Sequence, residues 1–382
     1  MNHTLFALAL LLLAGLGVFV FYHYPKSWRN NRLFLALVLF QHILGTLALG
    51  MILTVYRFLP WPWLKWIVSR VGTLYYVVIM MLTIFFGLRW VCSTLYCKIM
   101  RWRGLPIPLT GLRLLTDKRT HSIVFFLLSY LLAVTGFINI GILHQTSYDI
   151  TIHKASAHPD LNVVLIADTH CGAGTWGSTY DRLAEHILAA DPDLLLIAGD
   201  VFDETTSAED VARFRGVIER VHPPYGIYFI YGNHDDYRED WAAETLRDMG
   251  VQVLEDEMAV VAGDIQLLGR LDPKNNRMDL QELLDRSAPD PDRPLLILTH
   301  RPTELRRMAE LGCDLSLSGH THGFNIPQFM AVGLASDMYY GLRAYGNMTA
   351  VVTSGVSAWG FHYKWPAKSE VVTLHLHFDG AA

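Results

Sequence analysis

Hydrophobic and polar positions divide this chain into two parts with different patterns. The first part contains four apolar stretches, each long enough to cross a bilayer, for which about 20 residues suffice. The second part alternates short apolar runs with segments of helical periodicity. We therefore predict a transmembrane region of about four helices at residues 1–143, followed by an α/β domain at residues 144–382. The expected spans are Leu5–Tyr22, Leu33–Leu59, Val71–Val91 and Ser122–Leu143.

Basic residues between the spans predict their orientation. The loops after the first and third spans carry nine Lys or Arg, against about four on the opposite side. Because positive residues concentrate in cytoplasmic loops, these two loops are expected in the cytoplasm. The chain would then be a multi-pass protein of the plasma (inner) membrane, with its α/β domain extracytoplasmic. The first span lacks a clear cleavage site, so we interpret it as an uncleaved helix and not as a signal peptide.

Five apolar runs in the second part are typical of buried strands, and a polar cluster follows each one directly. The runs are Leu161–Ala167, Leu194–Ala198, Ile227–Tyr231, Leu295–Leu298 and Leu315–Leu317. The clusters are Asp168-Thr169-His170, Gly199-Asp200, Gly232-Asn233-His234-Asp235, Thr299-His300 and Gly319-His320-Thr321-His322. Because ligands gather beyond the carboxyl ends of strands in α/β sheets, we expect all five clusters at one edge of one sheet.

Helices are expected between these strands, and later strands predict a second sheet. The expected helices are Ser178–Ala190, Ser207–Val221, Arg238–Met249, Met278–Arg286 and Thr303–Leu311. The later strands are Val251–Leu254, Met258–Val261, Ile265–Leu268, Ala350–Thr353 and Glu370–His377. A further segment, Tyr148–Ile152, alternates as an edge strand would. Helices and strands in this order predict a layered αββα sandwich.

The polar clusters supply His, Asp and Asn, a ligand set suited to a pair of divalent metals. Two metals roughly 3.5–4 Å apart can clamp a phosphoryl group during in-line displacement. Such a pair needs a bridging carboxylate, and Asp200 suits it because Gly199 lets the backbone approach closely. Two dications outweigh two carboxylates and one hydroxide, so the site stays positive and favours a phosphate.

The motifs Asp-x-His, Gly-Asp-x-x-Asp, Gly-Asn-His-Asp, His and Gly-His-x-His lie in this order between Asn162 and Leu376. Together they resemble the calcineurin-like metallophosphoesterase superfamily. The resemblance implies a four-layer αββα sandwich that hydrolyses a phosphate ester or pyrophosphate by attack of a hydroxide held between two metals. It favours manganese or iron as the two divalent ions, with zinc, cobalt and nickel also compatible.

The resemblance also implies a role for each motif residue. Asp200 would bridge the metals, and His234 would contact the phosphoryl oxygen and protonate the leaving group. Asp203 would orient His234. Cys171 is interpreted as a small filler beside the site and not as a soft ligand. The first metal would be bound by Asp168, His170 and His322, and the second by Asn233, His300 and His320.

Two later segments bear on the substrate. Related proteins carry a Pro-rich stretch ending in Arg where this chain has Gly360–Pro366, in which Lys364 could supply charge but no bidentate grip. The stretch Phe324–Leu334 is apolar, and Met338–Tyr340 follows it. It is expected either to contact lipid or an acyl or prenyl chain, or to pack back on the sheet.

Charge separates the two parts as sharply as hydropathy does. Residues 1–143 hold thirteen Lys or Arg and a single acidic residue, which leaves eighteen basic and thirty-five acidic residues for the α/β domain. An acidic domain argues against a nucleic-acid polymer as partner. The expected partners are membrane lipid and a phosphorylated small molecule or lipid. Alternatives are an exported phosphodiesterase acting on soluble nucleotides or cell-wall phosphates, and a non-catalytic metal-binding sensor or scaffold.

Overall fold

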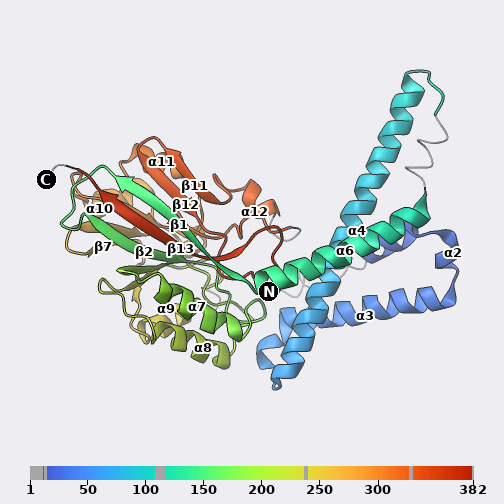
Figure 1. Cartoon of the computed structure of the whole chain (residues 1–382), viewed down its shortest axis with the longest axis horizontal. Helices are drawn as coiled ribbons and strands as arrows, with labels where there is room; N and C mark the ends of the chain where they lie inside the picture. The colour runs from blue at the N-terminus through green and yellow to red at the C-terminus, as the bar shows by residue number, and fades with distance from the viewer. Residues whose placement is uncertain (1–11, 13–14, 108–116, 236–239, 327–329, 381–382) are drawn as a thin grey trace. The chain divides into compact units, whose positions relative to one another are not determined.

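The computed structural model describes residues 12, 15–107, 117–235, 240–326 and 330–380. The chain divides into two compact units, Met1–Thr135 and Gly136–Ala382. The first unit is helical, whereas the second contains all the strands described (Figure 1).

Three helices within the described ranges are long and apolar enough to cross a membrane: α3 (Arg32–Thr54), α4 (Pro62–Trp102) and α6 (Lys118–Ile140). The number of four spans is not confirmed. Half of the expected span Leu5–Tyr22 lies outside the described residues, and its described end is helical from residue 15 onward. Many large apolar side chains of these helices are exposed, as expected of surfaces that face lipid.

Contacts between membrane-length helices include polar pairs. The Tyr75 hydroxyl lies 2.6 Å from Nδ1 of His42, which joins α4 to α3. The Gln41 amide donates to the Tyr130 hydroxyl at 2.9 Å, which joins α3 to α6. Short elements α2 (Lys26–Arg29) and η1 (Tyr56–Phe58) flank α3.

The second unit contains two six-stranded sheets. The first has the order β1-β13-β2-β3-β4-β6, and the second has the order β11-β12-β10-β9-β8-β7. The strands of the first sheet are β1 (Leu143–Ile152), β2 (Asp160–Ile166), β3 (Leu194–Ile197), β4 (Ile227–Phe229), β6 (Gln252–Val253) and β13 (Ser369–Phe378). Those of the second are β7 (Glu257–Val261), β8 (Ile265–Gly269), β9 (Leu295–Leu298), β10 (Leu315–Ser318), β11 (Gly341–Tyr345) and β12 (Met348–Val352).

Side-chain alternation along the strands produces four layers, as predicted. Val164 and Ile166 of β2 pack toward α7, α8 and α9, whereas Val163 and Leu165 pack toward the other sheet. The opposite face of the second sheet is covered by α10 and α11 (Figure 1). These helices are α7 (Ser178–Ala189), α8 (Ala208–Ile218), α9 (Trp241–Arg247), α10 (Leu280–Ser287) and α11 (Leu305–Glu310). Residues 238 and 239 of the expected helix Arg238–Met249 lie outside the described ranges.

The structure corrects two expectations about the sheets. The strands before the polar clusters do not share one sheet, because β2, β3 and β4 belong to the first and β9 and β10 to the second. Among the later strands, β6 and β13 pair within the first sheet. The reason is that an apolar run identifies a buried strand but not its hydrogen-bonding partner, and both sheets here are buried on two faces.

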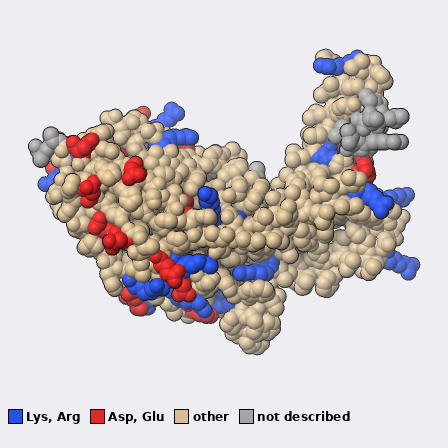
Figure 2. All heavy atoms as spheres, in the orientation of Figure 1, with Lys and Arg blue, Asp and Glu red and all other residues tan. Residues whose placement is uncertain are grey.

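The expected edge strand Tyr148–Ile152 is confirmed as part of β1, which lies at the edge of the first sheet and pairs in parallel with β13. Figure 2 shows acidic side chains over the part of the surface formed by the sheets, while the surface of the apolar helices carries mostly uncharged residues. Because α6 ends at Ile140 and β1 begins at Leu143, the connection between helix and sheet is very short.

Candidate metal centre

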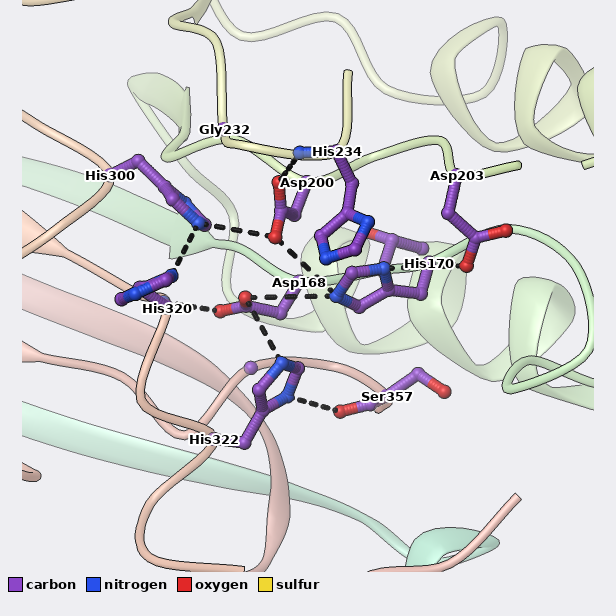
Figure 3. Close-up of polar contacts among 12 residues, drawn as sticks. Asp168, His170, Asp200, Asp203, Gly232, His234, His300, His320, His322 and Ser357 are labelled. Atoms are coloured by element: carbon purple, nitrogen blue, oxygen red, sulfur yellow. Dashed lines mark hydrogen bonds and ion pairs between the residues drawn. The ribbon is translucent and has the colours of Figure 1, made fainter. Parts of the chain in front are cut away.

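Seven candidate ligands come from the ends of five strands. Asp168 and His170 follow β2, Asp200 follows β3 and Asn233 follows β4. His300 follows β9 of the second sheet. His320 and His322 follow β10. The carboxyl ends of parallel strands from both sheets therefore meet at one place (Figure 3).

Six of these side chains form two groups that could each hold a metal ion. The first group is Asp168, His170 and His322, and the second is Asp200, His300 and His320. Within each group the potential ligand atoms lie within 4.8 Å of one another. The groups adjoin, because Oδ2 of Asp200 lies 3.6 Å from Nε2 of His170 and 3.1 Å from Nε2 of His300. Asp200 thus stands between the groups, where a bridging carboxylate has to stand (Figure 3).

The backbone of the ligand turns is held in an unusual conformation. Asp168, His170, Asp200, His320 and His322 all have positive φ values, between 43° and 70°. Such values are uncommon for residues other than glycine and cluster at functional sites. Gly199 has a φ of 83°, and a Cβ there would come within 2.5 Å of the Gly232 amide nitrogen. The two turns can therefore approach closely only with glycine at position 199.

The donor atoms fit divalent cations. Among the described residues, the buried atoms without a hydrogen-bond partner include Oδ1 of Asp168, Nε2 of His170 and Oδ1 of Asn233. Buried polar groups rarely stay unpaired, and oxygen and imidazole nitrogen atoms left in this way are natural metal ligands. The residues of both groups would hold the metals, with Asn233 adding an amide oxygen.

Electrostatics around the second group point the same way. Burial lowers the pKa of His300, but Asp200, together with Asp168 and Asp272, raises it to about 10. Burial and the neighbouring His300 lower the pKa of His320 to about 2. Nδ1 of His320 lies only 3.2 Å from Nε2 of His300, so one positive charge is accommodated between them and not two. A metal ion would take the place of that charge.

Asp235 fixes the turns that carry these ligands. Its Oδ2 accepts hydrogen bonds from the backbone nitrogens of Asp200, at 2.6 Å, and Gly232, at 2.8 Å. Its Oδ1 accepts from the Phe202 nitrogen at 3.0 Å. Burial, together with the Asp200 charge, raises the pKa of Asp235 to about 7. Asp235 therefore ties the turn after β4 to the turn after β3.

His234 lies at the junction of the two groups. Its backbone nitrogen donates to Oδ1 of Asp200 at 2.8 Å, and its ring packs edge-on to His170 with 5.2 Å between centroids. Burial lowers its pKa, but Asp200 and then Glu204 raise it, to about 9. The imidazole is therefore placed to donate a proton beside the candidate metal ligands.

The carboxylate next to His234 differs from the sequence-based prediction. Asp203 faces a different imidazole: its Oδ2 lies 3.4 Å from Nδ1 of His170, and its Oδ1 accepts from the Thr205 nitrogen at 2.7 Å. Glu204 instead places Oε2 3.4 Å from Nδ1 of His234. The turn after β3 points the two adjacent side chains to different imidazoles, so Asp203 orients a candidate metal ligand and Glu204 faces His234.

Sequence reasoning also missed two residues of the loop after β12. The indole nitrogen of Trp359 donates to Oε1 of Glu204 at 3.0 Å, and its ring packs against His234 with 5.1 Å between centroids. The Ser357 carbonyl lies 3.3 Å from Nδ1 of His322. Neither residue follows a strand in a recognisable motif, and only the path of the chain brings them to the site; Figure 3 shows Ser357 beside His322.

Two other expectations are decided by burial. Lys364 does not face a phosphate: its ammonium group is buried and donates to the carbonyls of Ser354, at 2.5 Å, and Gly355, at 2.6 Å. Cys171 is fully buried in the apolar core next to α7 and α8 and belongs to neither ligand group.

The apolar stretch Phe324–Leu334 is described only in part, because residues 327–329 lie outside the described ranges. Its end forms the short helix α12 (Met330–Leu334), in which Leu334 is 80% exposed. Met338 is buried, whereas Tyr339 and Tyr340 are partly exposed. Part of this region thus packs on the second sheet while another part presents apolar surface.

Comparison with known proteins gives the class of this domain. The family model for the calcineurin-like phosphoesterases matches residues 161–324. An uncharacterised metallophosphoesterase of Helicobacter pylori is 27% identical over 286 residues, which cover 72% of this chain and 76% of that protein. A Danio rerio protein, named as a transmembrane protein with a metallophosphoesterase domain, is 27% identical over 282 residues, covering 67% of this chain and 62% of that protein.

Among solved structures, the sulfate thiohydrolase SoxB of Thermus thermophilus aligns with 59% of this chain and 58% of its own, at 14% identity and a TM-score of 0.36. A similarity at that level does not bear on the activity of this chain. The family match and the relatives do bear on its activity. The chain carries a calcineurin-like metallophosphoesterase domain and is a metal-dependent phosphoester hydrolase. Its apolar helices and the relatives named as transmembrane proteins indicate a membrane protein.

Proposed function

We propose that this protein is a membrane-anchored phosphoesterase with two divalent metals, and that it hydrolyses a phosphate ester or pyrophosphate bond of a lipid-linked substrate. The observation that carries the proposal is the pair of Asp/His groups that meet at Asp200, with the His234 imidazole beside them. Two such groups are what a phosphoryl clamp requires.

Each residue has a defined part in this proposal. Asp168, His170 and His322 hold one metal, Asn233, His300 and His320 hold the other, and Asp200 is shared. When bound, the two metals supply an activated water and neutralise phosphoryl charge. His234 donates its proton to the departing oxygen, and Glu204 keeps the imidazole in the orientation that this requires. Manganese and iron are the proposed ions.

A lipid-linked substrate is supported by how the last membrane-length helix enters the catalytic unit. The Asn139 amide of α6 donates to the Lys364 carbonyl at 3.0 Å, and the Ser369 hydroxyl donates to the Ile140 carbonyl at 3.2 Å. The end of α6 is therefore part of the folded catalytic unit, which begins at Gly136. We further propose that residues 144–382 face the extracytoplasmic side of the plasma membrane, as the basic loops predict.

The test is hydrolysis by the full chain in detergent with added manganese. The panel contains 4-nitrophenyl phosphate, bis-4-nitrophenyl phosphate, and lipid phosphates and pyrophosphates. Asp200→Ala should abolish turnover, whereas Asp285→Ala, an exposed carboxylate on α10, should not change it. Preference for soluble nucleotide diesters would replace the lipid substrate, and two bound metals without turnover of any ester would indicate a sensor or scaffold.

A further inference from the structure

We infer that the apolar part of the substrate lies on the leaving-group side of phosphorus, against an apolar wall formed by Trp359 and Val332 and backed by the buried Ile140. This inference rests on the proposed phosphoesterase function and specifies which side of the scissile bond carries the hydrocarbon. The lipid would therefore depart as an alcohol or lipid phosphate and would not stay on the transferred phosphoryl group.

The first step concerns the position of the leaving group. In hydrolysis, a new P–O bond forms to the oxygen of water while the P–O bond to the leaving group breaks, and His234 gives its proton to the departing oxygen. The departing oxygen must lie within hydrogen-bond reach of that imidazole. Whatever lines the His234 ring therefore lines the leaving group.

The second step concerns what lies beside His234. The Trp359 indole packs against the imidazole with an angle of 31° between the ring planes. Its orientation is fixed by the hydrogen bond to Glu204, which also pairs with His234. An aromatic ring in this position offers a broad apolar surface to the leaving group.

The third step follows the apolar surface away from the ring. Trp359 packs against the buried residues Ile140 and Ala358, and Val332, which lies in α12, packs against the same pair. Ile140 is the last residue of α6, a candidate membrane span. A chain of apolar contacts thus leads from the candidate proton donor to the end of a membrane helix, and Leu334 extends apolar surface from the same short helix.

The other part of the site has the opposite character. The exposed Lys274 donates to the Asn233 carbonyl at 2.9 Å. Arg301, next to His300 in the chain, is held by Asp272 through contacts of 2.6 Å and 3.0 Å and keeps 31% of its side chain exposed. Cationic groups therefore gather near Asn233 and His300, where they suit a charged retained group, whereas apolar groups face the His234 ring.

The experiment uses two matched pairs of esters with the full chain in detergent. In the leaving-side pair, 4-hexylphenyl and 4-ethylphenyl esters, made both as phosphates and as phenylphosphonates, have similar leaving-group pKa values and differ in chain length. In the retained-side pair, 4-nitrophenyl esters of hexylphosphonate and ethylphosphonate carry the chain on phosphorus. Wild-type kcat/KM should favour hexyl over ethyl by about tenfold on the leaving side, which corresponds to burial of about two of the four additional methylenes at about 0.8 kcal/mol each. It should show little preference on the retained side.

Val332→Ser should reduce the leaving-side preference to about threefold or less, because a hydroxyl replaces part of the apolar wall. Val260→Ser, an exposed position on the distant edge strand β7, should leave the preference unchanged. Trp359→Phe keeps an aromatic face but removes the hydrogen bond to Glu204, so it should retain the preference while lowering kcat. The preference is the ratio of kcat/KM for the hexyl ester to that for the ethyl ester, both measured on one preparation. Partial misfolding of a variant lowers both values equally and therefore does not change the ratio.

Two results would overturn the inference: an equal or larger chain-length preference on the retained side, or a leaving-side preference that Val332→Ser does not change. Either result leaves the proposed function intact if 4-nitrophenyl esters are still cleaved with metal. Absence of metal-dependent cleavage of every ester, including the 4-nitrophenyl esters, would overturn the proposed function and this inference with it.

Discussion

The two ligand groups differ in how firmly the protein holds them. In the first group, Asp168, His170 and His322 are buried, and the two imidazoles stack with 5.2 Å between centroids. Nδ1 of His170 lies near a carboxylate oxygen of Asp203, and Nδ1 of His322 lies near the Ser357 carbonyl. The first group is thus enclosed and oriented before any metal arrives.

The second group is more open. His300 is buried and its Nδ1 lies 2.7 Å from the Ala198 carbonyl, but His320 is only partly buried and faces His300. Asn233 is also partly exposed. One candidate metal position is therefore enclosed by the protein, whereas the other is accessible to substrate and solvent. We therefore expect a tightly held metal at the first group and an exchangeable one at the second.

The largest effect on activity should come from single variants that each remove one imidazole, one variant for each ligand group. His170→Ala should lower kcat/KM about a thousandfold, since a metal contributes several kcal/mol of charge stabilisation. Excess manganese should not restore it, because the enclosed position has lost a buried ligand. His320→Ala should lose activity at low manganese and recover most of it at millimolar manganese.

Metal content after gel filtration, measured by elemental analysis, checks this pair. We expect about one metal retained in His320→Ala and loss of the tightly held metal in His170→Ala. Equal recovery of both variants by manganese would show that the two positions do not differ in affinity, and the comparison would fail.

A smaller effect should separate the two adjacent carboxylates. Glu204→Gln should lower kcat about a hundredfold for esters with poor leaving groups and much less for 4-nitrophenyl esters, since proton donation matters least when the leaving group is already stable. Asp203→Asn should instead weaken metal binding about tenfold or more, with the same loss for both kinds of ester at limiting metal.

The measurement is the dependence of kcat on leaving-group pKa across a series of phenyl esters at saturating metal. A steeper dependence is expected in Glu204→Gln only. If Asp203→Asn were steeper and Glu204→Gln unchanged, Asp203 and not Glu204 would orient His234, as the sequence suggests.

This pair of carboxylates shows where sequence reasoning ends. The seven candidate ligands could be named because each follows a short apolar strand in a local motif, and a strand directs its last residue toward the sheet edge. The choice between Asp203 and Glu204 depends on the turn after β3, in which adjacent side chains diverge. No periodicity encodes that turn.

Contacts between distant segments were equally out of reach. Trp359 reaches His234 across more than a hundred residues of chain, and β9 and β10 join a different sheet from β2 although their apolar runs look alike. Lys364 is expected to supply charge to phosphate because it lies in the segment where related proteins carry an Arg, but tertiary packing buries it. Local pattern thus predicts elements and ligands, whereas pairing and burial require the folded chain.

The smallest expected effect is on stability and concerns Lys364, which lies near Asp168 of the first ligand group. Burial lowers its pKa to about 7, and the charges of Asp168 and Glu370 offset only part of that effect. The folded protein therefore binds fewer protons at this residue than the unfolded chain between pH 7 and about 10.5, the ordinary lysine range. Stability must rise with pH across that window and be lost as pH falls through about 7.

Lys364→Met should remove this dependence. It also leaves the Ser354 and Gly355 carbonyls without their donor, so the variant melts lower throughout, and the informative quantity is the difference in Tm from wild type. That difference should grow by about 6–12 °C between pH 7 and pH 9.5, since the shifted pKa changes stability by about 3 kcal/mol over this range and 1 kcal/mol shifts Tm by roughly 2–4 °C in a domain of this size. Lys368→Met, at an exposed lysine four residues later, should show no such growth. A constant difference for Lys364→Met would mean that the ammonium group keeps its proton on folding, and that the cation behind Asp168 contributes to the first metal position at every pH.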